Sequence, residues 1–292
     1  MQESDLLNLI KSHFPDISLD KYQFIDTWRD NFVIIVDNEI VFRIPRKIQT
    51  IDYLEKEKKM LDIVSSNIPE VQIPIQTIIN WDYPFISMPY LDWQIFSKSI
   101  FSTLSELQKD KIAKDIANFL LKLHSIHKER FEELWYKTWW TDWWRIQSQQ
   151  ETFQKLCENI LPKAVLQNIL NYIEDLWNYN YPNKVMTHWD IWGWNVFLNH
   201  QNNSVLWIID FSDARIADPA IEFDCFRDFW QDFFEKVVSY YWWDQDLIVR
   251  SNFYRKRREM RILMHIVDKK LDWLNEQVEK IQNIFGNYER FN

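Results

Sequence analysis

The sequence predicts an α+β fold in two lobes, with an N-terminal antiparallel sheet that carries one helix and a mainly helical C-terminal lobe. Short runs rich in β-branched and aromatic residues follow one another through residues 22–91, with turns between them, as is typical of antiparallel strands. Beyond them, apolar residues recur at the three- and four-residue spacing of helices. We therefore expect a first lobe over residues 1–90 and a second over residues 91–292.

Each expected element follows from a local pattern. Leu6, Leu7, Ile10 and Phe14 share one helical face and predict an opening helix over residues 2–13. The expected strands are 22–25, 31–36, 39–45, 71–79 and 84–91, with one helix, 51–64, after the third strand. The expected helices of the second lobe are 109–127, 147–159, 163–179, 222–241, 247–267 and 270–284.

The composition limits the classes of partner. A net charge of -9 argues against a general nucleic-acid binder, whose affinity comes from Lys and Arg side chains that neutralise phosphates. The charge suits a small cationic ligand, and it is equally explained as a feature that keeps the protein in solution. No apolar run approaches the about 20 residues that span a bilayer, and Cys157 and Cys225 match no metal or disulfide pattern. We expect a cytoplasmic protein without membrane or nucleic-acid partners, and we make no prediction of its oligomeric state.

The stretch from Thr187 to Asp218 has the most specific spacing in the chain. His188, Asp190 and Asn195 form the pattern H-x-D-x-x-x-x-N, and an apolar run then leads to Asp210. In phosphoryl transfer the first Asp of this pattern accepts the proton of the attacking hydroxyl, and the Asn and the later Asp hold Mg²⁺ against the phosphates. Asp190 is therefore the candidate base, with His188 supporting its loop. Asn195 and Asp210 are the candidate Mg²⁺ ligands.

The strand-rich part offers candidate contacts for a nucleotide. The loop after the first strand, which includes Trp28 and leads to Asn31, is placed where phosphoryl-transfer enzymes lay a loop over the phosphates. The segment at the end of the last strand is expected to join the lobes, and its backbone groups would meet a purine. Its residues are Met88, Pro89, Tyr90 and Leu91.

Arg43, in the run VFRIPR, is the candidate cation for the α and β phosphates. Strand alternation places it on the opposite face from Phe42. Glu57 of the following helix is the best candidate for its acidic partner, and Glu55 is the second choice. The alternative is that Arg43 and Glu57 are separate, solvated surface charges.

Acidic residues after the central stretch could bind a cationic substrate. Of this group, Asp232 and Glu235 are the candidates, because the earlier acids lie close to the Asp218-Pro219 turn. The alternative is that they belong to an exposed acidic face of a helix.

The combination of T-H-x-D-x-x-x-x-N-V-F-L-N, I-I-D-F-S-D-A and I-A-D-P-A-I-E-F-D, with VFRIPR upstream, resembles the aminoglycoside phosphotransferase family. The resemblance covers nearly the whole chain and is closest to the branch that modifies the 2″-hydroxyl. It implies a protein-kinase-like fold, ATP or GTP as the phosphate donor, Mg²⁺, and an aminoglycoside as the acceptor. It also implies that Arg43 takes the place of the usual lysine, which alters the geometry of its phosphate contact because a guanidinium binds as a fork.

Glycine and tryptophan have abnormal frequencies. The chain has 2 Gly and 17 Trp, whereas glycine normally supplies roughly 20 residues in a chain of this length. The family pattern has glycine where Trp189, Trp194 and Trp207 stand, and usually where Trp28 and Trp93 stand. We therefore expect many of these tryptophans to be glycines in the cell, encoded by UGA and read here as tryptophan. The alternative is a protein that is naturally rich in tryptophan.

Two other functions stay open. The first is a kinase of the same fold that acts on another small hydroxylated molecule, because the catalytic motif does not specify the acceptor. The second is a nucleotide-binding protein without turnover, which follows if the tryptophans are real and Trp28 and Trp194 crowd the phosphates.

Overall fold

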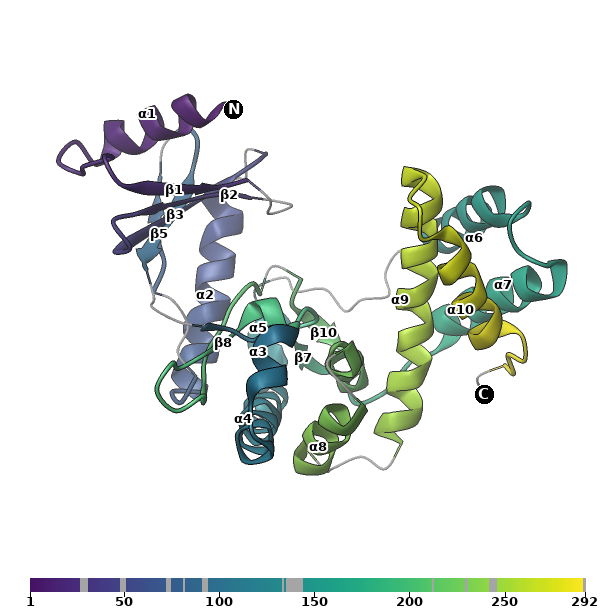
Figure 1. The fold of residues 1–292 in the computed structure, drawn as a ribbon. Coiled ribbons are helices and arrows are strands. Elements are labelled where there is room, and N and C mark those ends of the chain that lie inside the picture. The colour runs from purple at the N-terminus through teal and green to yellow at the C-terminus, as the bar shows by residue number, and fades with distance from the viewer. Residues whose placement is uncertain are drawn as a thin grey trace. The chain divides into compact units, whose positions relative to one another are not determined.

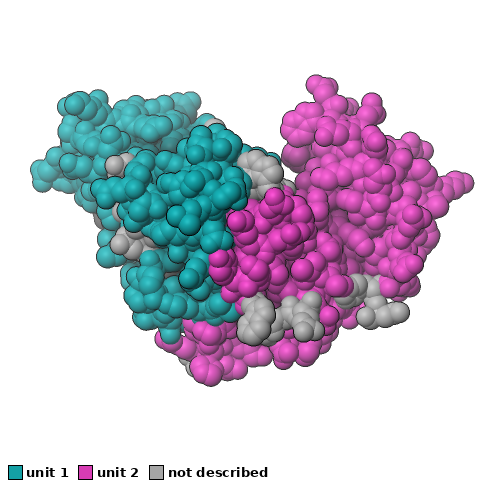
Figure 2. All heavy atoms as spheres, turned by 60° about the horizontal axis from the view of Figure 1, so that its bottom comes forward, with its two compact units in different colours: residues 1–123, 190–213 teal, residues 124–189, 214–292 magenta. Residues whose placement is uncertain are grey.

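The computed structural model describes residues 1–26, 31–47, 51–71, 75–80, 82–90, 94–132, 134, 144–211, 213–228, 231–241 and 246–290. The chain divides into two compact units, Met1–Leu123 with Asp190–Asp213 and His124–Trp189 with Ala214–Asn292 (Figure 2). Each unit therefore combines two separate parts of the chain. These units differ from the lobes expected at residues 1–90 and 91–292, and that division stays a prediction.

The first unit contains a five-stranded antiparallel sheet (Figure 1). Its strands are β1 (Tyr22–Ile25), β2 (Asn31–Val36), β3 (Ile40–Pro45), β4 (Thr77–Ile79) and β5 (Phe85–Pro89), in the spatial order β1-β2-β3-β5-β4. Helix α2 (Ile51–Asn67) lies in the chain between β3 and β4. The predicted antiparallel sheet with one helix is confirmed.

Strand alternation gives this sheet two faces with different neighbours. One face packs against α1 (Glu3–His13), which lies over the sheet in Figure 1. Its buried core consists of Leu6, Ile10, Phe32, Ile34, Val36, Phe42, Ile44 and Phe85. The other face carries the cross-strand rows Ile25–Val33–Arg43–Ile86 and Ile35–Val41–Met88. As expected from the alternation, Arg43 and Phe42 lie on opposite faces.

The rest of the first unit is a small sheet with two helices. Strands β6 (Gln94–Ile95), β8 (Val196–Leu198) and β9 (Val205–Ile208) pair in the order β6-β8-β9. A 3₁₀ turn, η1 (Gly193–Asn195), leads directly into β8. Helix α3 (Lys98–Thr103) precedes α4 (Glu106–Ser125), whose apolar face is buried. Because α4 presents a continuous apolar stripe, its position could be predicted within a few residues.

The second unit is mainly helical. Its helices are α5 (Glu129–Glu132), α6 (Trp144–Cys157), α7 (Lys163–Asn178), η2 (Pro219–Asp228), α8 (Gln231–Tyr241), α9 (Leu247–Lys269) and α10 (Leu274–Phe285). Strands β7 (Val185–Thr187) and β10 (Arg215–Ala217) form an antiparallel pair. The single helix predicted over residues 222–241 is wrong, because η2 and α8 are separate elements. None of the helices in the described part of the chain combines the length and apolar character that a membrane span needs.

Candidate active site

Asp190 and Asn195 belong to one compact, hydrogen-bonded loop. The Asn195 Nδ2 donates to the backbone oxygen of Asp190 at 2.8 Å and to its carboxylate Oδ2 at 3.1 Å. The backbone N–H of Trp192 also donates to the Asp190 carbonyl oxygen, and the backbone N–H of Asn195 donates to the Trp192 carbonyl oxygen, both at 2.8 Å. The spacing of five residues between Asp190 and Asn195 therefore closes the loop. The side-chain amide of Asn195 orients the Asp190 carboxylate.

The β8–β9 hairpin brings Asp210 close to this loop. Asn195 directly precedes β8 and Asp210 closely follows β9, so both lie at the same end of an antiparallel pair. The Ile209 amide donates to the Asn195 oxygen at 3.0 Å, which ties the two backbones together at that end. Asp210 has φ of 65°, a left-handed conformation that Asp tolerates better than most residues. The structure thus brings Asp190, Asn195 and Asp210 together within the first unit.

The chemistry of these side chains fits Mg²⁺ that arrives with a nucleotide. Asn195 uses its Nδ2 for Asp190, so its Oδ1 is the end of the amide that can bind a cation. Mg²⁺ prefers oxygen ligands and is typically held by one or two carboxylates together with substrate phosphates and water. Within the described ranges, no group of three or more His, Cys, Asp or Glu could hold a metal ion. The donor set therefore suits a nucleotide-bound Mg²⁺ better than a self-contained metal centre.

In the second unit, a buried carboxylate fixes the backbone that leads to Asp190. The Glu222 carboxylate accepts the backbone N–H of His188 through Oε1 and that of Trp189 through Oε2, the latter at 3.0 Å. The Nε2 of His124 lies 3.7 Å from Glu222 Oε1, and its Nδ1 hydrogen-bonds the Tyr241 hydroxyl at 2.6 Å. His188 and Glu222 are both buried. The backbone of His188 is thus held by Glu222, a residue that was not among the sequence-predicted site residues, and the supporting role of His188 stays a prediction.

Trp189 has the backbone of a glycine position. Its φ of 72° lies in the left-handed region, which costs a residue with a Cβ about 1–2 kcal/mol. Its indole has the Arg215 guanidinium 4.2 Å from the ring centre and that of Arg257 at 5.7 Å. Among the described tryptophans, Trp189 alone has a positive φ, so Trp194 and Trp207 show no such backbone requirement. Trp28 and Trp93 lie outside the described residues.

The first unit also contains a cavity of about 220 Å³ on the sheet face opposite α1. Its walls are mostly aliphatic or aromatic, and include Val33, Ile35, Val41, Met88, Phe197 and Ile208. Charged groups also line it, namely Arg43, Glu57 and Asp210. An apolar slot with a few charged groups is typical of a small-molecule site.

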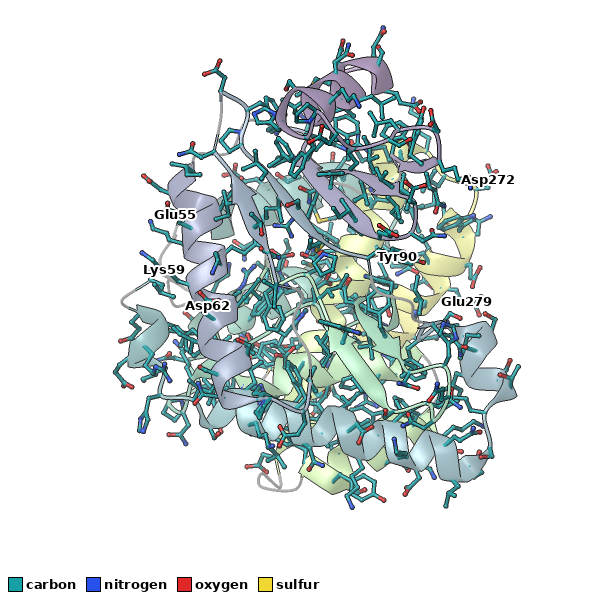
Figure 3. All side chains as sticks on the ribbon, turned by 90° about the vertical axis from the view of Figure 1, so that its left-hand side faces the viewer. Glu55, Lys59, Asp62, Tyr90, Asp272 and Glu279 are labelled. Carbon is teal, nitrogen blue, oxygen red and sulfur yellow. The ribbon has the colours of Figure 1, made fainter. Side chains whose placement is uncertain are left out.

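Arg43 and Glu57 form a buried ion pair in this cavity. The Arg43 Nη2 lies 2.8 Å from both Glu57 carboxylate oxygens, so one nitrogen serves the whole carboxylate. The Arg43 side chain is 11% exposed and that of Glu57 is 4% exposed, so neither is a solvated surface charge. Glu55, the second choice, lies with Lys59 and Asp62 on the outer face of α2 (Figure 3). The structure therefore brings Arg43 to Glu57 and leaves its Nε and Nη1 outside the pair.

The remaining nucleotide candidates differ in their surroundings. Met88 and Tyr90 line the cavity, whereas Pro89 is exposed. The backbone N–H of Tyr90 donates to the Glu39 carbonyl oxygen at 2.6 Å, so this N–H is used at the end of the β3–β5 strand pair. Asn31 begins β2 and pairs with Pro45. Leu91 lies outside the described residues.

The two acidic candidates for substrate binding lie on α8 in the second unit. Asp232 and Glu235 are both exposed, and Glu235 Oε1 accepts the Gln231 Nε2 at 2.8 Å. Their role in binding a substrate stays a prediction.

Residues 23–258 match the phosphotransferase enzyme family, APH. The fold is similar to the GDP and kanamycin complex of APH(2″)-IIIa, with a TM-score of 0.81 and 22% identity over 98% of this chain and 100% of that chain. It is also similar to the gentamicin complex of APH(2″)-IIa, with a TM-score of 0.69 and 19% identity over 99% and 97% of the chains. Macrolide 2′-phosphotransferase type I matches with a TM-score of 0.68 and 18% identity over 99% of each chain. The predicted kinase-like fold and the expected class, small-molecule phosphotransferase, are confirmed.

Proposed function

This chain belongs to the phosphotransferase enzyme family, and we propose that it moves the γ-phosphate of ATP or GTP to a hydroxyl of an aminoglycoside antibiotic in the cytoplasm. The observation that carries the proposal is the hydrogen-bonded assembly of Asp190 and Asn195 with Asp210 at the end of the β8–β9 hairpin. Solved structures of similar fold with GDP and kanamycin, and with gentamicin, support the choice of donor and acceptor.

In this proposal, Asp190 is the base. Its carboxylate accepts the proton of the acceptor hydroxyl while that oxygen attacks the γ-phosphorus. The bond from the γ-phosphorus to the β–γ bridging oxygen breaks and the nucleoside diphosphate leaves, while the side-chain amide of Asn195 holds the Asp190 carboxylate in place. Phosphoryl transfer needs little covalent work from the protein, so the position of the hydroxyl decides the rate. When bound to Asn195 and Asp210, Mg²⁺ supplies charge neutralisation at the phosphates.

Arg43 and the cavity bind the donor. Glu57 occupies only Nη2 of Arg43, so Nε and Nη1 are the donors for the α and β phosphates. The apolar walls beside Met88 and Tyr90 take the purine. The proposed acceptor is a polycation, for which Asp232 and Glu235 are candidate contacts.

A kinase of another hydroxylated small molecule is the second candidate. It is favoured by the likeness to macrolide 2′-phosphotransferase type I, whose name gives a macrolide as its acceptor. A nucleotide-binding protein without turnover is the third, and it depends on whether the tryptophans are real.

Transfer assays on two versions of the protein separate these functions. One version carries the sequence as printed, and the other carries glycine at positions 28, 93, 189, 194 and 207. Each is incubated with Mg²⁺ and ATP or GTP, and with kanamycin, gentamicin or a macrolide, and the acceptor is followed by mass. We expect phosphorylated kanamycin or gentamicin from the glycine version. Transfer to the macrolide alone would favour the second candidate, and nucleotide binding without transfer in both versions would contradict the proposal.

A further inference from the structure

Gln76 stands at the end of one of the two residue rows that face the cavity. It directly precedes β4, whose residue Thr77 pairs with Ser87 of β5. One step further along this antiparallel register, Gln76 comes opposite Met88, which pairs with Val41 of β3. Gln76, Met88 and Val41 all line the cavity, so the register and the cavity wall agree.

Among the residues that the structure describes, none bonds to the carbonyl end of the Gln76 side chain. Its Oε1 is buried and accepts no hydrogen bond from this part of the chain. Burial of an amide oxygen without a hydrogen bond is unfavourable, and proteins leave few such groups unpaired. The neighbouring wall is apolar, since Ile35, Val41 and Met88 offer no side-chain N–H. A ligand that enters this part of the cavity with an N–H group would satisfy the oxygen.

The two rows give the cavity a charged part and an apolar part, which suit the two ends of a nucleotide. Arg43 lies on the neighbouring row, two residues from Val41 along β3 and thus about 7 Å away. Its guanidinium suits the phosphates, whereas the aliphatic row with Gln76 suits a flat, apolar ring. Among the parts of a nucleotide, only the base offers a ring with an exocyclic amino group.

We propose that Gln76 is a specificity-determining residue for the donor: its buried Oε1 accepts a hydrogen bond from the exocyclic amino group of the purine. This inference rests on the proposed function, because it assumes that the cavity binds a nucleotide. Adenine carries this group at position 6 and guanine at position 2, so the same chemistry serves either donor.

Binding of matched nucleotide pairs tests this role. Calorimetry on the full chain compares ADP with purine riboside diphosphate, which lacks the 6-amino group, and GDP with inosine diphosphate, which lacks the 2-amino group. We expect the amino form of one pair to bind about three- to tenfold more tightly, which is the range of one hydrogen bond. The pair that shows the preference identifies the base.

Gln76→Met should remove that preference. Methionine keeps the length of the side chain without its amide, and replacement of an unpaired buried amide by an apolar group should not lower the melting temperature. Gln23→Met is the matched control, because Gln23 pairs with Ile35 at the other end of the same row and is exposed. We expect Gln23→Met to keep the preference.

Three results would overturn the inference. The first is an unchanged preference in Gln76→Met, which would mean that water satisfies the oxygen. The second is a loss of the preference in Gln23→Met as well. The third is equal binding of the two nucleotides in both pairs by the unmodified chain. All three leave the proposed function intact as long as ADP or GDP binds. If neither nucleotide binds, the proposed function fails and the inference fails with it.

Discussion

Each unit contains a buried arginine–carboxylate pair, and the two pairs are made differently. In the first unit, Arg43 reaches Glu57 through one nitrogen, lines a cavity and makes no other hydrogen bond within the described chain. In the second unit, Asp218 accepts Arg250 Nε and the Ala220 amide at 2.9 Å and the Tyr254 hydroxyl at 3.1 Å. The arginine of the first pair has nitrogens outside the pair, while the carboxylate of the second pair is surrounded by donors of the protein itself.

This difference separates acids that serve a site from acids that hold the fold. Burial raises the pKa of Asp218, while its bonds to Ala220, Arg250 and Tyr254 act in the opposite direction. Glu259 in the same unit is likewise surrounded by donors of the protein. A buried ion pair is therefore informative about function only when the hydrogen-bond donors and acceptors that it has already used are counted. Its burial alone does not distinguish the two cases.

Arg250→Met should cause the largest loss of stability. It leaves the Asp218 carboxylate buried without its cation, and the free energy of unfolding should fall by about 3–5 kcal/mol in urea titrations.

Arg43→Met is the matched variant. It should lose less stability, because the Arg43 side chain lines a cavity and remains 11% exposed. It should instead weaken nucleotide binding about 10- to 100-fold, as expected for lost charged hydrogen bonds. Equal losses of stability, with equal nucleotide affinity, would contradict the comparison.

Glu222→Gln should reduce turnover with little change in substrate affinity. Glutamine keeps one carbonyl oxygen for the backbone N–H groups of His188 and Trp189 and replaces the other oxygen by a donor. The loop before Asp190 then loses one acceptor, so kcat should fall about tenfold while KM stays nearly constant. Steady-state kinetics with both substrates measures this. A rise in KM without a fall in kcat would show that Glu222 does not position the base.

The free energy of unfolding of the Trp189→Gly variant should exceed that of the Trp194→Gly variant by about 1–2 kcal/mol. The first variant relieves a positive φ, whereas the second places glycine in the ordinary backbone of η1, where its flexibility is unfavourable. Thermal denaturation of the two single variants measures the difference. Equal stability would mean that the Arg215 and Arg257 contacts with the indole offset the backbone strain.

Glu259→Gln should have the smallest effect, which appears in acid. Burial raises the pKa of Glu259, but bonds from Lys280, Gln277 and Arg258 together hold it below its ordinary value of 4.5. Its contribution to stability is therefore fully present above about pH 4.5 and is lost as the pH falls through the lowered pKa. Unfolding titrations from pH 7 to pH 3 should show a steeper loss for the unmodified chain than for the variant. Parallel curves would remove Glu259 from the group of acids that are surrounded by donors of the protein.

The sequence predicted the parts of the fold and site that depend on local patterns. Period-two alternation placed Arg43 on the face away from Phe42, and the apolar run that leads to Asp210 is strand β9 in the structure. Glu57 was the first choice and Glu55 the second among the acids of the helix after β3, and the structure pairs Arg43 with Glu57.

The parts that the sequence did not predict depend on tertiary contacts. Glu222 lies 34 residues from His188, so no local pattern connects the two, although an acid in the apolar run A-I-E-F is a signal of a buried carboxylate. The split between η2 and α8 reflects the 3₁₀ turn that starts after Asp218, whose carboxylate caps the Ala220 amide. Gln76 could not be identified, because a polar residue before a strand has no distinctive pattern and only the cavity shows its unpaired oxygen.

We propose Asp190 as the base of a phosphoryl transfer to an aminoglycoside. Asp190→Asn keeps the size of the side chain and its contact with Asn195 but removes the proton acceptor. The most direct measurement compares the rate of phosphate transfer to kanamycin with the Kd of the donor nucleotide, in the unmodified chain and in this variant. In Asp190→Asn, transfer should fall by about 10²- to 10⁴-fold while the nucleotide Kd changes less than about threefold. Transfer at an unchanged rate would show that Asp190 is not the base.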